Sequence, residues 1–198
     1  MKLALNLNRR YTYADYLTWN DNELRELLNG FIRQISPPHT PEHDIVLRKI
    51  TDHLNNCISE NNNRCRVFCA PFDVRLPKSS NETADNQIYT VVQPDICLVC
   101  DSDNSKIDVH GCLGAPDLVV EILTLASQRY DLNEKFNLYE AAGVKEYWVV
   151  SPKEKGINVF ILQEDGEYDV GTVYEGDTQV PVQTLEGLTL SMEEIFNE

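Results

Sequence analysis

The sequence lacks any uninterrupted apolar run close to the ~18–20 residues that a membrane-spanning helix needs. Its first ten residues, MKLALNLNRR, form a weak apolar stretch that Asn6 and Asn8 interrupt, without the apolar core or cleavage site of a signal peptide. There is also no linker, repeat or low-complexity segment. We therefore expect one domain over residues 1–198 that is not attached to a membrane and is located in the cytoplasm.

Basic residues are scarce as well. The 198 residues contain 17 Lys and Arg against 32 Asp and Glu, which gives a formal net charge of −15. A surface of this sign repels phosphate at long range, so nucleic acid cannot be bound by overall charge. Any such role must rest on a local site with a divalent metal or a few gathered cations. The basic residues that we expect near such a cleft are Arg64, Arg66, Arg75, Lys78 and Arg129.

Six cysteines raise the question of a disulfide or zinc framework. Cys97 and Cys100 have C-x-x-C spacing, but they stand in an apolar, strand-like run. Residues three apart on a strand point to opposite faces and cannot share one metal. We therefore expect buried free thiols, as is usual in a reducing compartment, rather than a zinc-binding interaction domain. The six positions are Cys57, Cys65, Cys69, Cys97, Cys100 and Cys112.

Two amphipathic helices are predicted. The first begins at Pro41, behind the cap residue Thr40, and follows a 3.6-residue apolar stripe to about residue 60. The second covers residues 131–142, where Asp131 and Glu134 have the spacing of a capping box. A glycine follows it, as is common at helix C-termini. Helical or mixed structure at 13–17 and a short acidic helix at 192–196 complete this set.

Strands are predicted from apolar or alternating runs that turn residues bound. Asn29-Gly30 lies between two such runs, 25–28 and 31–35, and predicts a hairpin. The other expected strands are 66–76, 90–100, 117–125, 146–150, and the pair 157–162 and 167–174 around Asp165-Gly166. Helices and strands follow one another in mixed order, which predicts an α/β fold.

Two carboxylates interrupt strands that are otherwise apolar. Asp95 stands before Ile-Cys-Leu-Val, and Glu121 stands inside Leu-Val-Val-Glu-Ile-Leu. A charge inside a buried strand is costly unless it is paired or binds a metal. Two of them on adjacent strands indicate a shared cation, and oxygen ligands of this kind suit Mg²⁺ or Mn²⁺.

A lysine completes the set. Lys135 lies on the predicted helix that directly follows the Glu121 strand, so its side chain is expected to return to the strand's C-terminal end. There it would orient or activate a water and offset charge at a phosphorus transition state.

Each of the three residues also has a structural interpretation. Asp95 would open a strand after Pro94. Glu121 would pair with Arg129 or Lys135 in a salt bridge. Lys135 alone would be a solvated helix lysine. Their joint occurrence favours a functional site.

Several segments resemble one known family. They are QPD at 93–95, GAPDLVVEIL at 114–123, DLNEKF at 131–136 and YEAAGVKEYWVV at 139–150, together with ELLNG at 26–30, PEH at 41–43, APFDV at 70–74, Gly187-Leu188 and Ile195-Phe196. The set is similar to the Uma-type bacterial endonuclease-like family, a former domain of unknown function in the PD-(D/E)XK restriction-endonuclease superfamily. The resemblance covers nearly the whole chain.

The resemblance implies a restriction-endonuclease-like core, a central mixed β-sheet flanked by helices, with additional β-hairpins. It implies that Asp95, Glu121 and the backbone carbonyl of Ile122 hold Mg²⁺ or Mn²⁺. The superfamily's lysine usually follows the second acid by two residues, where this chain has Leu123. In the Uma-type family the lysine is taken to come from the next helix, which matches Lys135. The chain also has Thr124-Leu125 where the family commonly shows Ser-Pro.

Secondary candidates surround these three residues. His43 is expected to contact substrate or a water beside the metal, with a packing histidine as the alternative. Glu26 is a candidate auxiliary acid, although pairing with Arg25 or Arg33 across the hairpin is favoured. Asp131 is expected as a helix cap, Asp73 is the last candidate acid, and Tyr147 and Trp148 are expected in the core.

The leading hypothesis is a metal-dependent endonuclease that hydrolyses DNA, with catalytic Asp95, Glu121 and Lys135 and with weak, salt-sensitive DNA binding. The alternative is a nuclease fold used as a binding or assembly module with little or no catalysis. Its support is the acidity, the missing strand lysine and the altered Thr124-Leu125 loop. A homodimer is compatible with either hypothesis.

Overall fold

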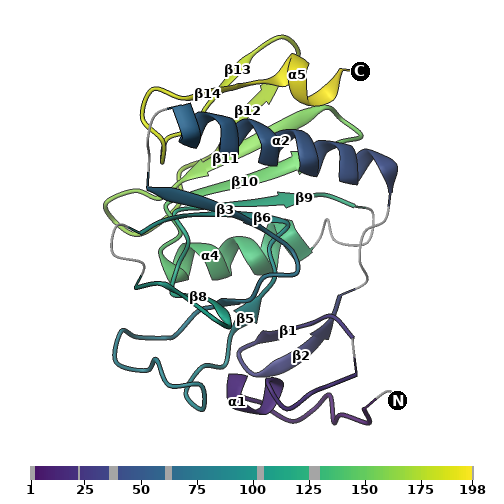
Figure 1. Cartoon of the computed structure of the whole chain (residues 1–198), viewed down its shortest axis with the longest axis vertical. Coiled ribbons are helices and arrows are strands. Elements are labelled where there is room, and N and C mark those ends of the chain that lie inside the picture. The colour runs from purple at the N-terminus through teal and green to yellow at the C-terminus, as the bar shows by residue number, and fades with distance from the viewer. Residues whose placement is uncertain are drawn as a thin grey trace.

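A six-stranded mixed sheet forms the centre of the computed structural model, which describes residues 3–21, 23–35, 40–60, 64–101, 105–124 and 130–197 (Figure 1). The strand order is β12-β11-β10-β9-β6-β3. β9 and β10 run parallel, and the other neighbouring strands are antiparallel. The bounds are β3 Cys65–Cys69, β6 Ile96–Cys100, β9 Leu118–Ile122, β10 Glu146–Ser151, β11 Gly156–Ile161 and β12 Thr172–Glu175.

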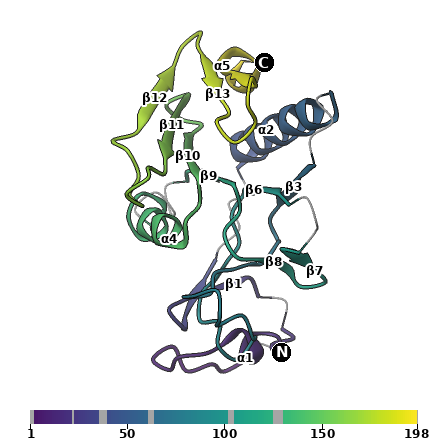
Figure 2. The same ribbon diagram turned by 90° about the vertical axis from the view of Figure 1, so that its left-hand side faces the viewer.

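Helices cover both faces of this central sheet (Figures 1 and 2). One face carries α2, Pro41–Glu60, and the short α5, Met192–Phe196. The other carries η1, Asp131–Lys135, which continues into α4, Phe136–Ala142. The predicted first helix is confirmed, because Thr40 Oγ1 accepts a hydrogen bond from the His43 amide at 3.2 Å.

Alternation along the strands decides which residues meet which helix. On β9, Leu118, Val120 and Ile122 enter the core beneath α2. Val119, between them, enters the core beneath α4. Glu121 therefore projects to the α4 side, into a layer that is otherwise apolar. This placement follows from the period of two that all β-strands share.

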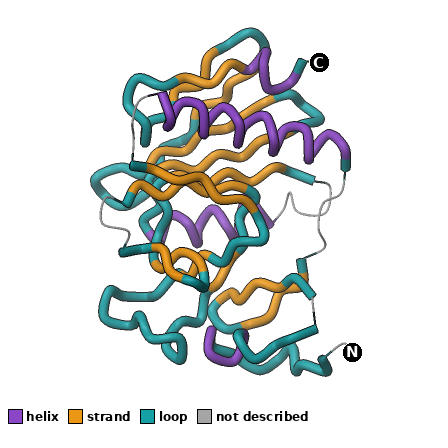
Figure 3. The backbone as a smooth tube through the Cα atoms, in the orientation of Figure 1, coloured by secondary structure: helices purple, strands orange, loops and turns teal. Residues whose placement is uncertain are grey.

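A second sheet lies at the N-terminal end of the molecule, with the strand order β2-β1-β5-β4-β8-β7 (Figure 3). The bounds are β1 Arg25–Leu28, β2 Phe31–Gln34, β4 Val74–Arg75, β5 Val91–Val92, β7 Ile107–Asp108 and β8 Gly111–Leu113, with α1, Tyr13–Tyr16, beside them. The predicted hairpin is confirmed: Asn29 and Gly30 both have positive φ, at 49° and 89°. A ribbon of β13, Gln179–Pro181, and β14, Thr189–Ser191, completes the fold.

Two strands that were predicted as continuous are each divided between the two sheets. The run 66–76 leaves the central sheet after β3 and enters the second sheet as β4, and 90–100 does the reverse as β5 and β6. Each break contains a proline, Pro71 or Pro94, which cannot donate to a sheet ladder. The breaks lie side by side, because the amide of Ala70 donates to the carbonyl of Asp95 at 3.2 Å.

Of three smaller predictions, one was wrong and two are confirmed. The helix at 131 has Tyr130 as its N-cap without a side-chain hydrogen bond, so Asp131 and Glu134 do not form a capping box. The strand pair predicted around Asp165-Gly166 is confirmed: β11 pairs antiparallel with β12, and a Leu162–Tyr168 bridge lies nearer the turn. Gly143 adopts the expected left-handed C-terminal conformation, with φ 82°.

The expectation of six free thiols was wrong for one pair. Cys65 and Cys100 form a disulfide between β3 and β6. The antiparallel register places these two residues opposite each other, a pairing that sequence spacing does not reveal. The other four cysteines are free, and the described residues contain no cluster of three or more His, Cys, Asp or Glu side chains able to hold a metal ion.

Within the described ranges, no helix is long and apolar enough to cross a membrane. Tyr147 and Trp148 are fully buried, as expected, on opposite faces of β10.

Gly111 offers a test of how tightly the second sheet is packed. A Cβ atom at Gly111, where φ is 122°, would lie 2.2 Å from the backbone oxygen of Asp73. We expect Gly111→Ala to lower the free energy of unfolding by about 3 kcal/mol or more in urea denaturation. Gly114→Ala is the matched control, since φ is 94° there and nothing lies within 4 Å of the added atom. It should cost only about 1–2 kcal/mol, and equal losses in both variants would contradict this packing.

Candidate active site

Glu121 and Lys135 form an ion pair at the C-terminal end of β9. Lys135 Nζ donates to Glu121 Oε1 at 2.7 Å, and the Tyr139 hydroxyl donates to the same oxygen at 2.7 Å. The side chains of Glu121 and Lys135 are 4% and 6% exposed. Lys135 and Tyr139 lie four residues apart on consecutive helical turns, so both reach the same strand residue. The predicted meeting of Glu121 with Lys135 is confirmed, and so is their pairing in a salt bridge.

Burial and neighbouring charges shift the protonation of both partners. Burial raises the pKa of Glu121, against the attraction of Lys135, and Asp131, Asp95 and Glu26 raise it further. For Lys135, burial alone would lower the pKa, but Glu121, Glu26 and Asp131 outweigh it and raise the pKa well above the usual value. Lys135 is therefore an ammonium group at neutral pH. It can donate hydrogen bonds and stabilise negative charge, but it cannot accept a proton.

Asp95 is fixed to the same strand end by a backbone contact. Its Oδ2 accepts a hydrogen bond from the amide of Ile122 at 2.7 Å, so it is anchored to the residue that follows Glu121. The break at Pro94 places Asp95 in the short connection between β5 and β6, where its side chain is 15% exposed. The structure thus brings Asp95, Glu121 and Ile122 together at one edge.

His43 reaches Asp95 from the first turn of α2. Its Nε2 lies 3.3 Å from Asp95 Oδ1, an ion-pair distance, but the angles do not make a hydrogen bond and this buried nitrogen has no other partner. Burial would lower the pKa of His43, yet the neighbouring Asp95 carboxylate, with a smaller effect of Asp44, raises it. The ring is 3% exposed. It therefore lies beside the carboxylate that was predicted to hold the metal.

Glu26 belongs to the same cluster, which corrects the prediction that it pairs with Arg25 or Arg33. Glu26 Oε1 accepts the Gln93 amide at 2.9 Å and lies 3.3 Å from Lys135 Nζ. Its Oε2 accepts the Tyr130 hydroxyl at 2.8 Å. Glu26 is 1% exposed, although it comes from the hairpin of the second sheet.

The true partners of the two arginines explain this correction. Arg25 makes two hydrogen bonds of 2.6 Å with Asp21, on the side of the hairpin away from Glu26. Arg33 lies opposite Glu26 in the register but places its guanidinium over the ring of Tyr130. Both arginines are close to Glu26 in the hairpin, so either was a reasonable partner. The contacts with Asp21 and Tyr130, which the hairpin alone does not reveal, exclude both.

The other predicted residues lie outside this cluster or at its margin. Asp131 is buried, with Oδ1 3.9 Å from Lys135 Nζ, and is not a helix cap. Asp73 accepts hydrogen bonds from Tyr13 and Gln93, which makes it a structural acid. Arg75 is buried and bonded to Asp108 at 2.7 Å, so it does not line a cleft.

Two residues named in the sequence analysis lie outside the described residues. Leu125 belongs to the loop that departs from the family pattern, and Arg129 was expected as a partner of Glu121 or as a cation at the cleft. Leu123, at the position of the superfamily's strand lysine, is partly buried in the core beneath α4. Lys135 approaches Glu121 from that same side.

The donor set fits a divalent cation that keeps most of its waters. Lys135 and Tyr139 both bond Oε1 of Glu121, and no described residue bonds Oε2. Asp95 likewise has one oxygen anchored on Ile122 and the other directed toward His43. Two carboxylates fall short of a three-residue protein cage, but Mg²⁺ is usually held by one or two carboxylates with water and substrate oxygens.

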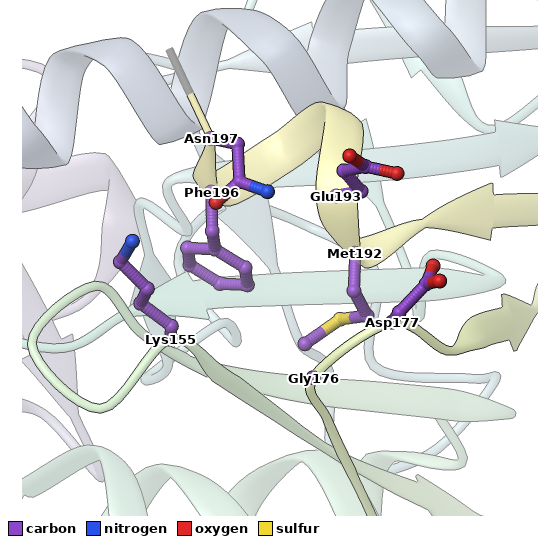
Figure 4. Close-up of a pocket in the computed structure, with 7 residues that line it drawn as sticks. All are labelled: Lys155, Gly176, Asp177, Met192, Glu193, Phe196 and Asn197. Atoms are coloured by element: carbon purple, nitrogen blue, oxygen red, sulfur yellow. The ribbon is translucent and has the colours of Figure 1, made fainter.

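A surface pocket at the C-terminal end is a separate feature (Figure 4). It lies between α5 and the turn that contains Lys155, and Phe196 and Met192 form its apolar part. Asp177 and Glu193 lie at its edge. None of the seven described residues that line it comes from the carboxylate cluster, so the pocket adds nothing to that site.

Removal of the lysine charge should destabilise the protein, because it leaves buried carboxylates without their cation. We expect Lys135→Met to lower the free energy of unfolding by about 3–5 kcal/mol at neutral pH in the absence of metal. The control is Lys145→Met: Lys145 also bonds a buried carboxylate, Asp117, at 2.7 Å, but its side chain is 69% exposed. That variant should lose no more than about 1 kcal/mol. Similar losses in urea denaturation would show that the Lys135 pair is not the buried anchor described here.

Comparison with known proteins agrees with this geometry. Residues 13–193 match the Uma2 family model, described as putative restriction endonuclease. An uncharacterized protein of Synechocystis sp. is 21% identical over 185 residues, which cover 92% of this chain and 89% of that protein. A crystal structure of a putative nuclease belonging to DUF820 from Anabaena variabilis has a TM-score of 0.72 and 19% sequence identity, over 94% of this chain and 97% of that one.

The structural likeness confirms the predicted restriction-endonuclease-like fold, with its central mixed sheet between helices. The family match extends over most of the sequence and includes every residue of the carboxylate cluster. The chain therefore belongs to the Uma2 family of restriction-endonuclease-type proteins.

Proposed function

We propose that this protein is a metal-dependent endonuclease that hydrolyses phosphodiester bonds of DNA with Mg²⁺ or Mn²⁺. One observation supports this most: Asp95, Glu121 and Lys135 meet at one strand end although they come from a loop, a strand and a helix. A fold held together without function has no need to bury several carboxylates around one lysine, since such groups are costly to desolvate.

In this proposal Asp95 and Glu121 hold the metal through their available oxygens, together with the carbonyl of Ile122. The metal supplies a Lewis acid that polarises a phosphoryl oxygen and stabilises the leaving oxygen. The amide of Ile122 fixes the orientation of Asp95, and the Tyr139 hydroxyl fixes that of Glu121. These anchors keep the two carboxylates in place before any ligand arrives.

Lys135 is the positively charged group of the proposed site. As an ammonium donor it orients the attacking water and stabilises charge that develops on the phosphate. His43 lies beside Asp95 with Nε2 available, so it contacts the substrate or a water at that edge. Glu26, which comes from the second sheet, helps to hold Lys135 at 3.3 Å.

A second candidate function is a nuclease fold that binds or assembles with little catalysis. The observation that favours it is the position of Lys135, which is held by Glu121 at 2.7 Å and by Glu26 at 3.3 Å. A lysine satisfied in this way does not need a substrate. The net charge of −15 also favours this second function, because it opposes the approach of DNA.

Plasmid cleavage with Mg²⁺ or Mn²⁺ separates these two functions. The wild type should nick supercoiled DNA and stop when EDTA is added, whereas Asp95→Ala, Glu121→Ala and Lys135→Ala should each lose on the order of 10²-fold in rate or more. Asp52→Asn, an exposed change on α2, is the control that should cleave normally. A folded wild type without cleavage would favour the binding module, and cleavage that persists in the variants would place the site elsewhere.

Glu26→Gln tests whether the hairpin carboxylate contributes. The substitution keeps the size of the side chain but removes one of the charges that position Lys135, so cleavage should fall on the order of 10-fold. Glu42→Gln, exposed in the first turn of α2, is the matched control and should be unchanged. Equal rates for Glu26→Gln and the wild type would reduce Glu26 to a structural residue.

A further inference from the structure

Arg33 is a cation next to the proposed site that the sequence suggested only as an ion-pair partner of Glu26. It lies on β2, directly opposite Glu26 in the hairpin register, and its guanidinium carbon is 3.2 Å from the centroid of the Tyr130 ring. The residue is half-buried. A guanidinium stacked on an aromatic ring keeps its N–H edge free while losing rotational freedom.

Tyr130 connects Arg33 to the carboxylate cluster. Its hydroxyl donates to Glu26 Oε2, and Lys135 Nζ lies 5.4 Å from the centroid of the same ring. Arg33 and Lys135 are therefore both held against one buried tyrosine. A strand of nucleic acid that brings one phosphate to Lys135 would pass Arg33 with a neighbouring phosphate.

The charge of Arg33 is available, unlike that of the other arginines nearby. Arg25 is bonded twice to Asp21, and Arg75 is bonded to Asp108. Among the described residues, no carboxylate lies within ion-pair distance of Arg33. Its partly exposed guanidinium is therefore available to a ligand. Its geometry suits two parallel hydrogen bonds to a phosphate.

We propose that Arg33, stacked on Tyr130, binds a backbone phosphate of the DNA strand beside the scissile bond. The proposal rests on the proposed function, since it assumes that DNA is the substrate. It places the path of the strand along the hairpin side of the site. It also identifies where a strongly acidic protein contacts a polyanion.

The test is equilibrium binding of a short fluorescent DNA duplex, measured by anisotropy without metal and again with Ca²⁺, over a range of salt concentrations. Ca²⁺ has the same preference for oxygen ligands as Mg²⁺. Arg33→Gln should weaken binding about 10-fold. It should also reduce the slope of log K against log salt by about one, as expected for the loss of one phosphate contact. Arg33→Lys keeps the charge but loses the planar stacking. Its affinity for the duplex should therefore lie between those of the wild type and Arg33→Gln.

Arg66→Gln is the matched control, because the structure places Arg66 on β3 and not beside the carboxylate cluster, contrary to the expectation from the sequence. Arg66 is an exposed arginine over another ring, Phe68, on the edge strand of the central sheet, and it pairs with Val99, well along β6 from Asp95. It should bind within about twofold of the wild type with an unchanged salt slope.

The outcomes distinguish this proposal from the proposed function. If the wild type binds DNA and Arg33→Gln binds equally well, the role of Arg33 alone is overturned. The same holds if Arg33→Gln loses no more affinity than Arg66→Gln. Wild type that binds no DNA under either condition would overturn both. Circular dichroism and thermal unfolding of Arg33→Gln show whether the variant is folded, and Arg33→Lys provides the second measurement if it is not.

Discussion

The buried pair of Glu121 and Lys135 is the interaction on which the rest of the site depends. A carboxylate in the apolar layer beneath α4 is tolerated only with a cation beside it, because an isolated charge there would cost several kcal/mol. Lys135 provides that cation at 2.7 Å and in turn draws Glu26 from the second sheet to 3.3 Å. The pair therefore joins the central sheet, the helix that follows β9, and the N-terminal hairpin. Each partner neutralises the other, so removing one would leave the other as a buried charge without a counter-ion.

Two prolines set the position of the remaining residues. Pro71 and Pro94 each end a ladder, and at these points the chain crosses between the two sheets. The second crossing places Asp95 just before β6, where its carboxylate accepts the amide of Ile122. It also exposes the amide of Gln93, which donates to Glu26. A continuous strand from 90 to 100 would bury Asp95 in a ladder and leave no junction between the sheets.

The sequence predicted the parts of this arrangement that depend on local periodicity. The helix from Pro41 and the Asn29-Gly30 hairpin follow from spacing along the chain, and the meeting of Glu121 with Lys135 follows because the helix comes directly after the Glu121 strand. The resemblance of motifs added the fold. What it did not predict depends on contacts between elements. Glu26 was assigned to its strand neighbours because hairpin register is visible in a sequence, whereas its approach to Lys135 requires the two sheets to be placed. The Cys65–Cys100 bond was missed for the same reason.

Charge connects the site to the character of the whole chain. Three carboxylates, those of Glu121, Glu26 and Asp131, surround the single ammonium of Lys135, and Asp95 lies beyond them with His43. One lysine stands against several acids, which is why the proposed site includes a further cation. These acids repel phosphate, as does the net charge of −15. A protein of this kind can bring a phosphodiester to its carboxylates only where positive charge has been placed locally. The proposed metal would provide that charge between the acids, and Arg33 would provide it at the edge.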